Sequence, residues 1–348
     1  MSPYILGSLM FGLGMGTATT LTSTHWLLAW MGLEINTLAI VPLMAQHHHP
    51  LAVEATTKYS LTQATAAAML LFASTTNAWL TGQWDIQQMS HPMPVTMVTL
   101  ALALKIGLAP VHAWLPEVLQ GLDLTTGLIL STWQKLAPFS LLLQIQPSNS
   151  TLLIILGLTS TLMGGWGGLN QTQLRKIIAY SSIAHLGWMI LVIQFSPALT
   201  LLTLTLYITM TLSTFLVFKM NKFTNVNTLA PSWAKTPALT AITPLILLSL
   251  GGLPPLSGFM PKWLILQELT KQGLALTATI TALSALLSLY FYLRLSYAMT
   301  LTMPPNTPMG LSPWRLQTSQ VSLPLAVSTV STLAFLPLPP LISLSFTP

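Results

Sequence analysis

The sequence predicts an all-α polytopic membrane protein with about eleven transmembrane helices, and three observations support this fold class. Of its 348 residues, 52% are hydrophobic and 5% are charged, whereas a soluble domain carries about 25% charged residues. The mean hydropathy is +0.69. The apolar residues form runs long enough to cross a bilayer core, which takes about 20 residues per helix. No repeated alternation of the kind that builds a transmembrane β-barrel is present.

Short loops rich in Pro, Asn and Gly separate the apolar runs. In order, the predicted spans cover residues 3–23, 25–46, 57–81, 94–116, 124–144, 151–170, 174–194, 197–219, 237–270, 274–301 and 321–343. No segment between them has the composition of a soluble domain or of a flexible linker. The sequence therefore predicts a single membrane domain over residues 1–348.

The charges of the loops predict the orientation. With the N-terminus inside, the inner loops hold or adjoin seven basic residues, namely Lys58, Arg175, Lys176, Lys219, Lys222, Lys235 and Arg315. The opposite loops hold Lys271 and almost no other basic residue. Basic residues concentrate on the inner side of membrane proteins. An odd number of spans then places the C-terminus outside.

The fourth and ninth spans contain helix-breaking sequences. The fourth contains Gly107 and Pro110, and the ninth contains Gly252 with Pro254 and Pro255. Interrupted helices five spans apart predict two inverted five-helix bundles, each with a broken fourth helix. The bundles would cover residues 1–145 and 150–302, followed by a C-terminal helix over 320–344. The alternative is an ordinary proline kink in each span.

Four ionisable residues lie deep in predicted spans: Glu34 in the second, Lys105 in the fourth, Lys135 in the fifth, and Lys262 after the break in the ninth. A residue at the midpoint is about 15 Å from either interface, which is farther than a lysine side chain reaches. Each such residue costs about 3 kcal/mol to insert. A functional role explains this cost, and the alternative for Glu34 is a purely structural ion pair with one lysine.

The chemistry of these residues favours proton transfer. Burial disfavours the charged forms of lysine and glutamate alike, so both can exchange protons near neutral pH. His112 follows Lys105 by seven residues, a step that returns to the same face of an uninterrupted helix, although Pro110 lies between them. His185 lies within the seventh span. Histidine can relay protons. The alternative for each histidine is a hydrogen bond to a neighbouring helix.

Other kinds of site are not indicated. The chain has no cysteine, which excludes cysteine-ligated iron–sulfur clusters. No nucleotide-binding loop, catalytic triad or paired carboxylate motif is present. The basic residues are scattered and form no patch for nucleic acid. We therefore expect neither a cofactor nor a metal in this chain.

Three segments together resemble a known family: Trp30–Glu34, Lys105–Glu117 and Leu174–His185. They look like the antiporter-like subunits of respiratory complex I, and the resemblance covers nearly the whole chain in order. It implies two inverted five-helix bundles with broken fourth helices. By motif, it also implies a proton path through Glu34, Lys105, Lys135 and Lys262, with His112 and His185 as relays.

The resemblance further implies a subunit of NADH:ubiquinone oxidoreductase that does no redox chemistry itself. NADH, FMN, iron–sulfur clusters and ubiquinone would be used by other subunits. The partners would be other membrane subunits of the complex, including neighbouring antiporter-like subunits, and lipids. The location would be the mitochondrial inner membrane, with the N-terminus on the matrix side and the C-terminus on the intermembrane-space side.

Two other functions compete with this interpretation. A free-standing cation/proton antiporter would share the fold, but sodium prefers oxygen ligands, and three of the four deep residues are lysines. A purely structural membrane subunit would not need lysines at mid-membrane depth. Proton translocation therefore remains the favoured function.

Overall fold

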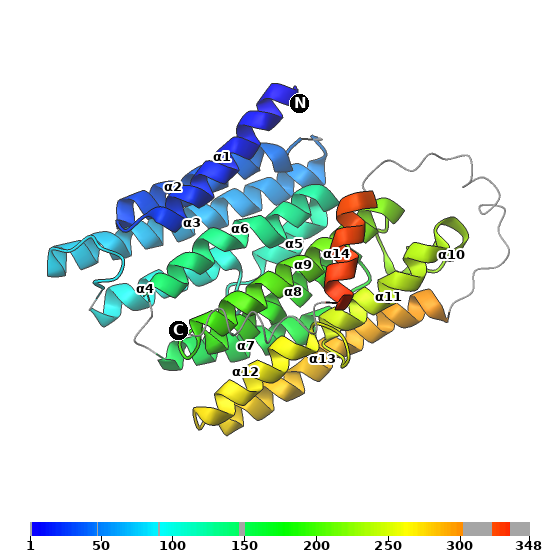
Figure 1. Cartoon of the computed structure of the whole chain (residues 1–348). Helices are drawn as coiled ribbons and strands as arrows, with labels where there is room; N and C mark the ends of the chain where they lie inside the picture. The colour runs from blue at the N-terminus through cyan, green and yellow to red at the C-terminus, as the bar shows by residue number, and fades with distance from the viewer. Residues whose placement is uncertain (1, 47, 90, 146–149, 302–321, 335–348) are drawn as a thin grey trace. The chain divides into compact units, whose positions relative to one another are not determined.

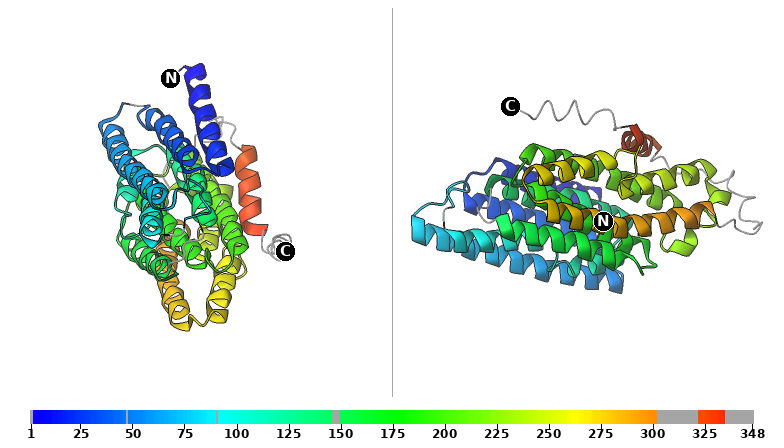
Figure 2. Two further views of the ribbon diagram at one scale, coloured as in Figure 1. Left: turned by 90° about the vertical axis from the view of Figure 1, so that its left-hand side faces the viewer. Right: turned by 90° about the horizontal axis from the view of Figure 1, so that it is seen from below.

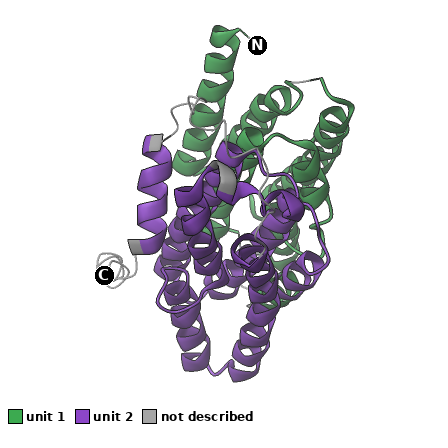
Figure 3. Ribbon diagram, turned by 90° about the vertical axis from the view of Figure 1, so that its right-hand side faces the viewer, with its two compact units in different colours: residues 1–160 green, residues 161–348 purple. Residues whose placement is uncertain are grey.

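The computed structural model describes the whole chain except residues 1, 47, 90, 146–149, 302–321 and 335–348. Arg315 and the end of the predicted C-terminal helix lie outside the described residues. Helices joined by loops form the described part of the chain, and no strand is present among the described residues. The chain divides into two compact units, residues 1–160 and 161–348, drawn in green and purple in Figure 3.

Unit 1 contains the first six helices. They are α1 (Pro3–Thr22), α2 (Trp26–Met44), α3 (Pro50–Thr81), α4 (Pro92–Ile106), α5 (Trp114–Gly121) and α6 (Leu124–Ile145). Helix α3 begins before the predicted span at residue 57, because His49 caps it and Pro50 suits the first helical position. The fully buried Trp26, Phe139 and Leu102 contribute to the core of this unit.

The boundary between the units falls inside α7 (Ser150–Gly168). Unit 2 continues with α8 (Leu174–Val192), α9 (Pro197–Asn221), the 3₁₀ turn η1 (Val226–Thr228), α10 (Ser232–Lys235), α11 (Pro237–Gly251), α12 (Phe259–Lys271), α13 (Ala275–Thr300) and α14 (Ser322–Ala334). Helices α11 and α13 lie side by side (Figures 1 and 2), and α14 packs against α9.

Both predicted breaks are present. Gly107 (φ +86°) directly follows the last residue of α4 and caps it, and Gly252 (φ +77°) caps α11 in the same way. Both glycines are left-handed, a conformation that glycine adopts without steric cost. The predicted fourth and ninth spans are therefore two helices each, α4 with α5 and α11 with α12.

Each unit also has one isolated β-bridge between the loop after its first helix and the loop after its third. In unit 1 the bridge joins His25 to Asp85, and in unit 2 it joins Gln173 to Asn225. The two units thus share the order of their helices, the position of the break and the position of a loop contact.

The outer helix faces suit lipid. Tyr4, Phe11, Trp79 and Leu276 are between 69% and 87% exposed. Threonine and serine hydroxyls along the helices donate to carbonyls three or four residues earlier, as Thr62 does to Tyr59, so these hydroxyls are satisfied within their own helices. Among the described residues, five helices are long and apolar enough to cross a membrane by length and composition: α1, α2, α7, α9 and α13.

Candidate functional site

The break between α4 and α5 is stabilised by side chains from three helices. Trp114 Nε1 donates to the Leu104 carbonyl at 3.1 Å, and Gln63 Nε2 donates to the Lys105 carbonyl at 3.5 Å. Thr159 of α7 donates to the Ala109 carbonyl at 3.2 Å. These donors replace the backbone donors that an interrupted helix loses.

Lys105 lies in the last turn of α4, beside this break. Its side chain is buried, at 6% exposure, and its Nζ has no hydrogen-bond partner. The C-terminal end of a helix carries a partial negative charge. The end of α4 therefore favours a cation at this position.

Glu34 of α2 is partly buried and lies within electrostatic range of Lys105. Its Oε2 has no hydrogen-bond partner, and no ion pair within 4.0 Å joins it to Lys105. The structure therefore places the two groups as neighbours and not as a closed salt bridge.

Lys135 lies in the middle of α6 and is 3% exposed. Pro138 stands three residues later, inside the same helix. Because proline has no backbone N–H, the Gln134 carbonyl loses its usual helical donor. Lys135 therefore sits beside a locally weakened part of α6.

Lys105 and Lys135 line the same cavity, which has a volume of about 20 Å³. Polar side chains from three helices complete it, namely Asn36, Thr37, Tyr59, Gln63 and Gln134. A water molecule needs roughly 10–15 Å³ of such volume and two to four polar partners. The cavity is thus large and polar enough to hold a water molecule.

His112 does not share a helix face with Lys105, so that prediction was wrong. The residue lies in the non-helical segment between Gly107 and Trp114, because Gly107 turns the chain out of the helix. The residues that line the Lys105 cavity do not include His112.

Lys262 and His185 line one cavity in unit 2. Lys262, near the start of α12, donates from Nζ to the Gly251 carbonyl at 2.7 Å, so it reaches back across the break to the end of α11. His185 of α8 lines a second cavity of about 20 Å³ together with Lys262. The His185 ring lies 5.7 Å from the ring of Tyr207.

The lysine of the first break comes before its glycine in the sequence, and the lysine of the second break comes after its glycine. Lys105 precedes Gly107 by two residues, whereas Lys262 follows Gly252 by ten. The tenth residue after Gly107 is Glu117. The equivalent position of the first break therefore carries a carboxylate.

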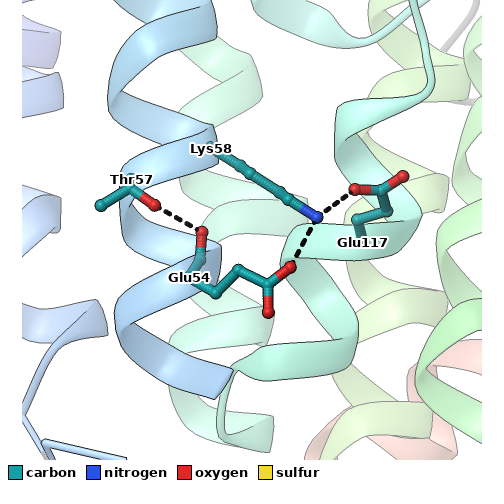
Figure 4. Close-up of polar contacts among 4 residues, drawn as sticks. All are labelled: Glu54, Thr57, Lys58 and Glu117. Carbon is teal, nitrogen blue, oxygen red and sulfur yellow. Dashed lines mark hydrogen bonds and ion pairs between the residues drawn. The ribbon is translucent and has the colours of Figure 1, made fainter. Parts of the chain in front are cut away.

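Glu117 belongs to an exposed ion cluster on α3 and α5 (Figure 4). Lys58 Nζ lies 2.6 Å from Glu117 Oε2 and 2.8 Å from Glu54 Oε1. All three side chains are more than 40% exposed. Exposed pairs of this kind contribute little to stability, so this cluster adds little to the packing of α5 on α3.

Several polar residues at the cavities were not predicted. Tyr59 and Gln63 are 2% and 4% exposed, and Asn36 is 2% exposed. The available signal was a polar side chain far from the ends of an apolar span. That signal is weak because threonine and serine are frequent throughout these helices.

Comparisons with known proteins agree with this architecture. The family described as NADH:quinone oxidoreductase/Mrp antiporter, TM, matches residues 23–288, and NADH dehydrogenase subunit 2 C-terminus matches residues 289–343. NADH-ubiquinone oxidoreductase chain 2 of Tetraodon nigroviridis is 75% identical, over 98% of both chains. That of Gadus morhua is 73% identical, also over 98% of both chains.

Solved structures show the same fold. A chain of respiratory complex I from Thermus thermophilus, a structure with bound aureothin, has a TM-score of 0.85 at 27% identity, over 98% of this chain and 80% of that one. A chain of the Mrp complex from Dietzia sp. DQ12-45-1b has a TM-score of 0.84 at 18% identity, over 97% and 76%. The second likeness concerns the fold alone.

The relatives with high identity are oxidoreductase subunits, which favours a complex I subunit over a free-standing antiporter. The apolar helices, the buried lysines and the broken helices are the features expected of such a subunit. The chain belongs to the NADH-ubiquinone oxidoreductase chain 2 family, the antiporter-like, proton-translocating membrane subunits of respiratory complex I.

Proposed function

We propose that six residues carry protons through this subunit, namely Glu34, Lys105, His112, Lys135, His185 and Lys262. The observation that supports the proposal most strongly is the cavity shared by Lys105 and Lys135. A water molecule both accepts and donates protons, so it can pass one between two amines. Two ammonium groups in one buried cavity repel each other, which favours one charged and one neutral lysine.

Glu34 would control the charge of Lys105. An ionised carboxylate within electrostatic range stabilises the ammonium form. Neutralising Glu34 would remove that stabilisation and favour proton release from Lys105. The absence of a closed ion pair between them supports this role, because a direct salt bridge would hold both charges in place.

His185 and Lys262 would form the corresponding exchange site of unit 2. They line one cavity, and the Lys262 ammonium bonds a backbone carbonyl and no carboxylate. His112, in the break of unit 1, would connect Lys105 with groups outside the shared cavity.

The proposal includes the finer architecture. The chain would cross the mitochondrial inner membrane about eleven times, with residues 1–145 and 150–302 as inverted five-helix bundles and residues 320–344 as a C-terminal helix. The N-terminus would lie in the matrix, as the loop charges indicate. NADH, FMN, iron–sulfur clusters and ubiquinone would belong to other subunits, and lipids would cover the outer faces.

A lysine substitution tests the proposal. Lys135→Met keeps the length of the side chain and removes its charge, so complex I should assemble while proton uptake per NADH oxidised falls in sealed liposomes. Lys271→Met is the matched control, because Lys271 is 60% exposed in its side chain and lies outside both cavities. Equal proton uptake by the two variants would refute the role of Lys135.

A further inference from the structure

Helix α14 turns a polar side inward. The buried side includes Ser328 and Thr332, which are 6% and 0% exposed, whereas Val327 and Val330 on the other side are each 63% exposed. No residue of Ser322–Ala334 is ionisable. Polar residues of membrane helices pack toward other helices, so the role of α14 depends on what its polar side contacts.

The polar side of α14 contacts the break between α11 and α12. Ser257 lies in the non-helical segment 252–258 and is 0% exposed, and its hydroxyl donates to the Thr332 carbonyl of α14. The same segment contains two prolines, which have no backbone N–H. A side-chain hydrogen bond therefore contributes more to holding this segment in place than it would inside a regular helix.

The next residue, Gly258, packs closely against the end of α11. A Cβ at Gly258 would overlap the Ser249 carbonyl of α11 and would lie 3.3 Å from Met210 Sδ of α9. Gly258 is also the N-cap of α12, and it lines the cavity that contains His185 and Lys262. The start of α12 is thus pressed against α11 at one residue and tied to α14 by the residue before it.

The hydrogen bond of Lys262 depends on where α12 starts. Lys262 is the fourth residue of α12, and its Nζ reaches back to the Gly251 carbonyl at the end of α11, at 2.7 Å. Such bonds span about 2.7–3.2 Å. A displacement of α12 by about 1 Å away from α11 is therefore enough to lengthen this bond beyond its usual range.

The first break has a corresponding contact. Thr159 of α7 donates to the Ala109 carbonyl at 3.2 Å, and it is also within reach of the Ile155 carbonyl of its own helix. Helix α7 follows α6 as α14 follows α13. In each unit, the helix after the predicted five-helix bundle is therefore bonded to the break, although the hydroxyl comes from the helix in unit 1 and from the break in unit 2.

We propose that Ser257 is a positioning residue for Lys262 and that α14 is the helix that holds it. The Ser257 hydroxyl ties the break to α14, and this tie keeps the start of α12 where the Lys262 ammonium reaches the Gly251 carbonyl. The inference rests on the proposed role of Lys262 in proton exchange. It gives α14 a part in that exchange, although Ser322–Ala334 contains no ionisable side chain.

The test uses assembled complex I in sealed liposomes. Ser257→Ala removes the hydroxyl and should lower the proton uptake per NADH oxidised, because a misplacement of about 1 Å can slow a transfer step by up to roughly 100-fold. Ser257→Cys has nearly the same size and keeps a weak donor, so it should retain more of the uptake. Ser284→Ala is the matched control: Ser284 is 2% exposed on α13, and its hydroxyl donates to the Thr281 carbonyl of its own helix.

High-resolution maps of these variants provide a readout that a general loss of stability would not change. We expect the distance between Lys262 Nζ and the Gly251 carbonyl oxygen to exceed about 3.2 Å in Ser257→Ala and to remain 2.7 Å in Ser284→Ala. An unchanged distance in Ser257→Ala, or equal proton uptake by Ser257→Ala and Ser284→Ala, would overturn the inference. If Ser257→Ala does not assemble, the weaker bond of Ser257→Cys should lengthen the same distance by a smaller amount, and no change would again overturn it.

A lysine variant separates this inference from the proposed function. If Lys262→Met pumps normally, the proposed role of Lys262 itself fails. If Lys262→Met is impaired while Ser257→Ala pumps as Ser284→Ala does, only the role of Ser257 fails.

Discussion

Gly252 is the position at which one added methyl group should disturb Lys262. The residue ends α11 with φ +77°, and a Cβ placed there would lie 2.8 Å from Lys262 Cδ and 2.9 Å from its Nζ. Lys262 is flexible, so in Gly252→Ala we expect it to move away. The movement would break its 2.7 Å hydrogen bond to the Gly251 carbonyl.

The expected loss of stability in Gly252→Ala has two parts. An alanine in the left-handed conformation costs about 1–2 kcal/mol. Loss of a hydrogen bond from a charged donor costs about 1.5–3 kcal/mol. Gly273→Ala isolates the second part, because Gly273 has nearly the same φ, +74°, with nothing within 4 Å of an added Cβ. Gly252→Ala should therefore be less stable than Gly273→Ala by about 1.5–3 kcal/mol.

The assay compares the two variants in assembled complex I. The midpoint of heat inactivation should fall further in Gly252→Ala, and proton uptake per NADH should fall in that variant alone, because Lys262 leaves the end of α11. If the two variants lose the same stability and pump equally, the contact between Gly252 and Lys262 carries none of the effect, and the reasoning is refuted.

Two further predictions concern unit 1. Trp114→Phe removes the donor to the Leu104 carbonyl at the break and should lower the stability to heat by about 1–3 kcal/mol. Trp79→Phe is the control and should change little, because Trp79 is 86% exposed. Similar losses in both variants would contradict the role of Trp114 at the break. Glu117→Gln weakens the exposed pair with Lys58 and should leave proton uptake per NADH unchanged, so a clear loss of pumping would show that the ion cluster takes part in transport.

Much of the site could be predicted from sequence because the depth of a residue in the membrane follows from its position within an apolar run. The position of Lys135 within an apolar run indicates burial, and the structure shows it 3% exposed. Gly107 and Gly252 indicate breaks because their neighbouring prolines cannot continue a helix. These two glycines are the C-cap residues of α4 and α11.

The remaining features depend on how helices turn about their axes and pack. The seven-residue step from Lys105 to His112 returns to one face only in a continuous helix, and the predicted break at Gly107 removes that relation. Gln63 resembles any polar residue of a span until α3 is placed against the break, where its amide meets the Lys105 carbonyl. The start of α3 at Pro50 was missed because hydropathy does not distinguish a polar helix from a loop.

The two lysines at the breaks solve one electrostatic problem in different ways. The C-terminal end of a helix presents unpaired carbonyls and a partial negative charge, which stabilises a cation inside apolar surroundings. Lys105 stands in the last turn of α4 itself, and Lys262 reaches back from α12 to the last residue of α11. The position equivalent to Lys262 in the first break is then free for Glu117, which lies at the surface with Lys58. Each half-helix end is thus matched by one lysine, which explains why the charges at the two breaks follow different sequence patterns.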